Sequence, residues 1–105
     1  MEGRRLADEA ISYRNLGNFK KAFELLKTAL NEYNYKPAII LIGTTAVLKG
    51  DIQNAIEWFS LQIKECKEGD EVLLIESYSN LGSIYNQHIR DFDRALEMYE
   101  LALKV

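Results

Sequence analysis

The chain has 105 residues, 48% of them hydrophobic, and a formal net charge of −3 at pH 7. This suits one domain with a packed core and excludes an intrinsically disordered chain. The acidic balance argues against nucleic-acid and membrane partners, and no apolar run reaches the ~18 residues of a membrane span. The first ten residues lack the apolar stretch of a secretory signal, and the single cysteine cannot form an internal disulfide, so we expect a cytoplasmic protein.

Apolar residues recur at helical spacing along the whole chain, and only one proline interrupts the pattern. Between the first two helices, Gly17 supplies a permissive backbone position and Asn18 is a candidate N-cap. Pro37 suits the first turn of the third helix. The pattern predicts six helices, at residues 2–15, 19–33, 37–48, 52–68, 71–87 and 92–105.

The third predicted helix is apolar on nearly every side and has no polar face beyond Thr44 and Thr45. A helix of this kind is usually buried on both sides. Its β-branched residues would also suit a strand. The helix is favoured because Gly50 and Asp51 follow it, as a Gly-Asn pair follows the first helix.

Capping residues delimit the fourth and sixth predicted helices. The fourth begins after the candidate N-cap Asp51, and we expect it to reach about Glu68 with Gly69 as its C-cap. The sixth begins after the candidate N-cap Asp91. Its inward face is expected to contain Phe92, Ala95, Tyr99 and Ala102.

One pattern recurs in three hairpins. A small residue opens each second helix, at Ala22, Ala55 and Ala95, so the steps are 33 and 40 residues. A large apolar residue follows each alanine four positions later, at Leu26, Phe59 and Tyr99. Five residues before each alanine lie Gly17, Gly50 and Arg90, so the glycine pattern fails in the third hairpin.

This pattern resembles the tetratricopeptide repeat, a helix hairpin of about 34 residues. The third hairpin matches best, at Tyr78, Leu81, Gly82, Tyr85, Phe92, Ala95, Tyr99 and Ala102. The resemblance implies an all-α fold, a right-handed α-solenoid of six antiparallel helices without a further capping helix at its C-terminal end. Its three repeats would lie at about residues 2–34, 36–69 and 71–105, as a single domain or as a fragment of a longer array.

The third hairpin departs from the family period. Tyr85 and Ala95 are ten residues apart, whereas the matching Tyr13 and Ala22 are nine apart. We therefore expect residues 86–90 to form either a wider loop or a π-type bulge at the end of the fifth helix.

The resemblance implies an interaction scaffold, because the family binds proteins and peptides in a concave groove lined by the first helix of each hairpin. The residues that we assign to this face are Ile11, Arg14, Ile40, Leu41, Thr44, Val47, Leu48, Ser79, Asn80, Ser83 and Asn86. An apolar centre with polar flanks suits an amphipathic helix or an extended peptide with apolar anchors. The alternative is that the apolar residues contact another segment of a longer array or a second copy.

Family members that clamp the carboxylate tail of heat-shock proteins use two lysines, two asparagines and an arginine. The matching positions here are Ala7, Ile11, Leu41, Glu76 and Asn80. The first four do not fit, and the Glu76 carboxylate would repel a carboxylate ligand. We therefore expect no binding of such tails.

Two other functions are open: a regulatory ligand- or peptide-sensing domain of a larger protein, and a module that self-associates through helix 37–48 or the C-terminal helix. His88, Asp91 and Asp93 are spaced as a metal or acid–base cluster would be, but the two aspartates are better explained as an N-cap and a first-turn acid. No phosphate loop, carboxylate pair or nucleophile triad is present. We therefore expect no enzyme activity, no metal and no cofactor.

Overall fold

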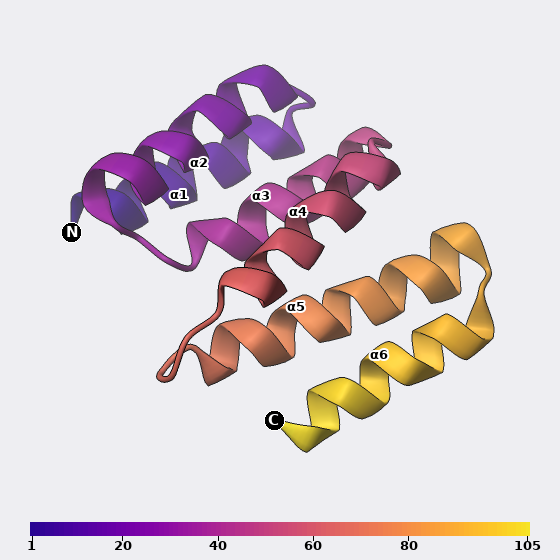
Figure 1. Ribbon diagram of the computed structural model, residues 1–105. Helices are drawn as coiled ribbons and strands as arrows, with labels where there is room; N and C mark the ends of the chain where they lie inside the picture. Colours follow the sequence, from indigo (N-terminus) through magenta and orange to yellow (C-terminus); the bar gives the residue numbers. More distant parts are fainter. The chain divides into compact units, whose positions relative to one another are not determined.

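The computed structural model describes residues 1–105 and contains six α-helices, one π-helical turn and no strand (Figure 1). The helices are α1 Glu2–Asn15, α2 Phe19–Tyr33, α3 Ala38–Lys49, α4 Ile52–Glu65, α5 Glu71–Ile84 and α6 Phe92–Lys104, and the π-helical turn Tyr85–Ile89 continues α5. This confirms the all-α fold class and is consistent with the expected solenoid of helix hairpins. The first two helices have the predicted bounds.

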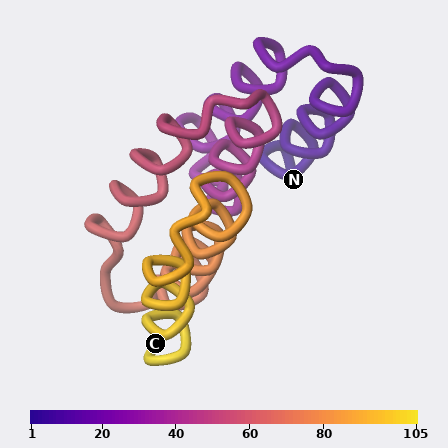
Figure 2. The backbone as a smooth tube through the Cα atoms, turned by 90° about the vertical axis from the view of Figure 1, so that its right-hand side faces the viewer, coloured from indigo at the N-terminus to yellow at the C-terminus, as the bar shows by residue number.

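The chain divides into two compact units, residues Met1–Lys49 and Gly50–Val105. In the first unit α1 and α2 form a hairpin, and α3 packs mainly against α2. In the second unit α5 packs against both α4 and α6 (Figure 2). The predicted middle repeat, residues 36–69, contains the boundary between the units.

Small residues let α1 and α2 approach closely in the first unit. Ala10, Ala22 and Ala29 are buried, and Leu26 packs with them in the core. The turn between the helices has the predicted chemistry, because Gly17 takes a φ of +83° and the Oδ1 of Asn18 accepts a hydrogen bond from the backbone N–H of Lys21. The predicted cap and turn are thus confirmed.

The third helix starts one residue later than predicted. Pro37 directly precedes α3, and its carbonyl accepts a hydrogen bond of 3.4 Å from the N–H of Leu41. Proline is favoured here because its missing N–H would have no partner in a first turn.

In the second unit, α5 and α6 meet through Leu81, Gly82, Ala95 and Tyr99. Leu81 and Ala95 are buried, as the pattern predicts. The expectation for Phe92 is wrong, since 55% of this residue is exposed, whereas the Tyr99 ring packs beside Gly82 as expected. Phe92 occupies the first position of α6, where the Arg90 guanidinium stacks over its ring at 5.1 Å. One side of its ring therefore meets a cation.

The predicted end of the fourth helix is also wrong. α4 ends at Glu65, and Cys66 has an extended backbone with φ −62° and ψ 139°. The carboxylate of Asp70 accepts a hydrogen bond from the N–H of Lys67, and the carboxylate of Glu71 accepts one from the N–H of Gly69. Acidic side chains that bond nearby backbone N–H groups compete with helix formation, so this segment forms a turn.

The π-helical turn Tyr85–Ile89 confirms one of the two forms expected for the extra residue. The carbonyl of Tyr85 accepts hydrogen bonds from the N–H groups of both Arg90 and Asp91. Arg90 has a φ of +65°, close to the +83° of Gly17 and +89° of Gly50 at the matching positions. All three turns thus use a left-handed residue before the second helix, although the third uses an arginine.

Candidate partner-binding faces

The open side of α3 is the most apolar of the candidate faces. The buried residues of α3 gather on one side of the helix and are Ala38, Ile39, Ile42, Gly43, Thr45 and Ala46. The residues that stay at least partly exposed on the other side are Ile40, Leu41, Thr44, Val47 and Leu48, the five predicted from the sequence. The helix is therefore buried on one side only, contrary to the usual behaviour of helices with this composition. We call these five residues the α3 face.

The only polar side chain of the α3 face is satisfied within the helix. The hydroxyl of Thr44 donates a hydrogen bond of 3.2 Å to the carbonyl of Leu41. The most exposed apolar member is Leu48, with 61% of its surface accessible. The α3 face thus offers carbon surface, which gains free energy on leaving water.

Ile11 and Arg14 lie on α1, which contacts α3 within the first unit. Both side chains are partly exposed. The Nε of Arg14 is buried and has no hydrogen-bond partner. A buried N–H without a partner is uncommon and costs free energy.

The polar residues predicted for α5 are all partly exposed, at Ser79, Asn80, Ser83 and Asn86. Two of them already make internal hydrogen bonds. The amide of Asn80 donates to the carbonyl of Glu76 at 2.7 Å, and the hydroxyls of Ser83 and Tyr99 lie 3.2 Å apart. These two groups are less available to a peptide backbone than the sequence suggested.

Sequence reasoning missed Val72, which is 69% exposed at the start of α5. It precedes Glu76 by four residues, Ser79 by seven and Ser83 by eleven, so it lies on the same side of the helix. The helical spacing was the signal that would have found it. Val72 adds an apolar position to a row that otherwise contains polar side chains.

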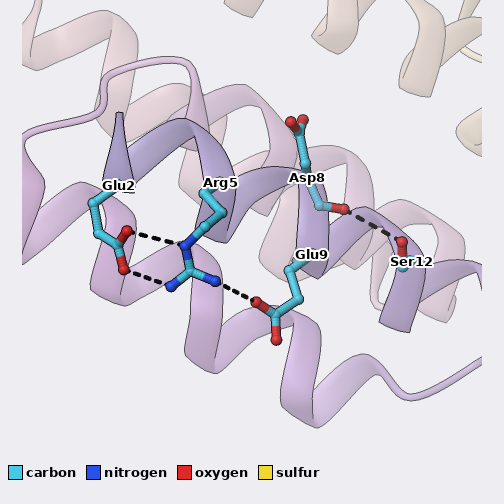
Figure 3. A network of polar contacts seen from close by, with 5 residues as sticks. All are labelled: Glu2, Arg5, Asp8, Glu9 and Ser12. Atoms are coloured by element: carbon cyan, nitrogen blue, oxygen red, sulfur yellow. Dashed lines mark hydrogen bonds and ion pairs between the residues drawn. The ribbon is translucent and has the colours of Figure 1, made fainter.

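Three charged side chains on α1 form a network of hydrogen bonds and ion pairs (Figure 3). The Nε of Arg5 donates to Glu2 at 2.9 Å, and its Nη1 donates to Glu9 at 3.2 Å. The hydrogen bond from Arg5 lowers the pKa of Glu2 below its ordinary value. All three side chains are exposed, so this network contributes little to stability.

In the second unit, Arg94 is held by Tyr85. Its guanidinium lies 5.4 Å from the centroid of the Tyr85 ring. A hydrogen bond with the Tyr85 side chain raises the pKa of Arg94 above its ordinary value. This contact links α6 to the π-helical turn.

The residues that resembled a reactive cluster have structural roles. Asp91 caps α6, because its Oδ1 accepts a hydrogen bond of 3.1 Å from the N–H of Arg94. Asp93 lies in the first turn of α6, where the helix dipole favours an acid. His88 is exposed on the π-helical turn. No group of three or more His, Cys, Asp and Glu side chains is arranged to hold a metal ion.

None of the helices combines the length and the apolar character needed to cross a membrane. No curated protein matches the chain.

A family model described as tetratricopeptide repeat matches residues 77–105. The match begins in α5 and includes the π-helical turn and α6. This is the hairpin whose sequence matches the repeat pattern best. A match to this family indicates a module for protein–protein interaction. Residues 77–105 thus match the tetratricopeptide repeat, and the six helices of the chain are consistent with hairpins of that family.

Proposed function

We infer that this protein is an interaction scaffold that binds a peptide or an amphipathic helix of a partner protein on the α3 face. The observation that carries this inference is the composition of the face. Four of its five side chains are apolar, and the hydroxyl of the fifth is bonded within the helix. A surface of this kind loses little by leaving water, whereas a polar surface would have to exchange its hydrogen bonds with water for others.

Arg14 supports a polar anchor beside this apolar centre. Its partly exposed guanidinium is a cation that can donate hydrogen bonds to a carboxylate or a backbone carbonyl of the ligand. The proposed ligand therefore combines apolar side chains with at least one hydrogen-bond acceptor. On α5, in the second unit, the partly exposed Ser79 and Asn86 are proposed as a separate polar face for contacts with a partner.

The test begins with peptides selected against the 105-residue chain from a random display library. Their binding is then measured by fluorescence anisotropy to the wild type and to Leu41→Glu and Leu48→Glu. Leu48 is the more exposed of the two, so its change is the less disruptive to folding. The matched control is Leu16→Glu, at a leucine that is 81% exposed just after α1.

Either α3 variant is expected to weaken binding at least about a hundredfold, since it places a carboxylate against apolar groups, while the control stays within about twofold of wild type. Circular dichroism checks that each variant remains helical. Selected peptides that bind Leu48→Glu and wild type equally would exclude the α3 face. If Leu41→Glu unfolds the domain, Leu41 belongs to the core instead.

A further inference from the structure

We draw no further inference here: the strongest candidate, the exposed apolar patch of Leu96 and Leu103 on the outer side of α6, carries nothing, because nothing in the structure shows what covers it.

Discussion

The ring of Tyr99 fills the space beside Gly82, where a Cβ atom would lie 2.8 Å from Cε1 of the tyrosine. The hydroxyl of the same tyrosine is 3.2 Å from that of Ser83 on the next residue of α5. The missing side chain of Gly82 thus allows α5 and α6 to approach, and Tyr99 closes the gap. This contact lies within the segment that matches the tetratricopeptide repeat.

Gly82→Ala should therefore destabilise the chain, by about 1–2 kcal/mol in urea unfolding, because the Tyr99 ring must swing outward and lose its contacts. The control is the same change in a Tyr99→Ala background. There the added methyl meets no ring, so alanine should stabilise the helix by up to about 1 kcal/mol through its higher propensity. The same effect in both backgrounds would show that the ring does not set the spacing.

Arg90 has a left-handed backbone conformation. Glycine occupies the matching position in the other two turns. Arg90→Gly should raise the free energy of unfolding by about 0.5–1 kcal/mol, because the strain of a left-handed arginine exceeds its stacking on Phe92. The reciprocal variant Gly17→Arg should lower stability by about 1 kcal/mol, the cost of the same conformation. Thermal unfolding measures the change in stability of each variant. Effects of the same sign would mean that φ does not govern these positions.

Ser77 is fully buried on α5, and its hydroxyl has no hydrogen-bond partner. Ser77→Ala should stabilise the chain by about 1 kcal/mol, because a buried hydroxyl without a partner is removed. The control Ser79→Ala lies on the partly exposed side of the same helix and should give only the gain in helix propensity, up to about 0.5 kcal/mol. Loss of stability in Ser77→Ala would indicate that the hydroxyl bonds a group inside the core.

The pKa of Glu2 should lie below its ordinary value in a proton NMR titration, because Arg5 hydrogen-bonds its carboxylate. A carboxyl whose folded-state pKa is lowered stabilises the fold above its unfolded pKa, and this contribution disappears as the pH falls through the folded pKa. Arg5→Gln should return the pKa of Glu2 towards the ordinary value. Arg4→Gln removes a neighbouring cation outside this network and should move it less.

Local patterns in the sequence were sufficient for most helix limits. The Gly-Asn pair at residues 17–18 and the N-cap Asp91 combine a permissive backbone with a side chain that bonds the next helix, and both act as predicted. The extra residue between Tyr85 and Ala95 likewise predicted a departure from the helix. Whether it would be a loop or a π-helical turn depended on how the end of α5 packs against α6, which spacing does not specify.

For the candidate faces, the sequence predicted some of the exposed residues and missed others. Helical spacing identified the five residues of the α3 face, because it specifies which side chains share a side of a helix. It did not predict the exposure of Phe92, which was expected to point inward with Ala95. It also missed Val72, whose exposure follows from its place at the start of α5.

The sequence by itself determined that the chain is helical, where most helices begin and end, and that its hairpins follow a tetratricopeptide pattern. These properties depend on hydrogen bonds, backbone conformations and apolar spacing within a few turns. Only the tertiary structure decided which apolar sides are covered and which remain exposed. Burial depends on the helices that pack nearby, and an apolar residue has the same spacing whether another helix covers it or water does.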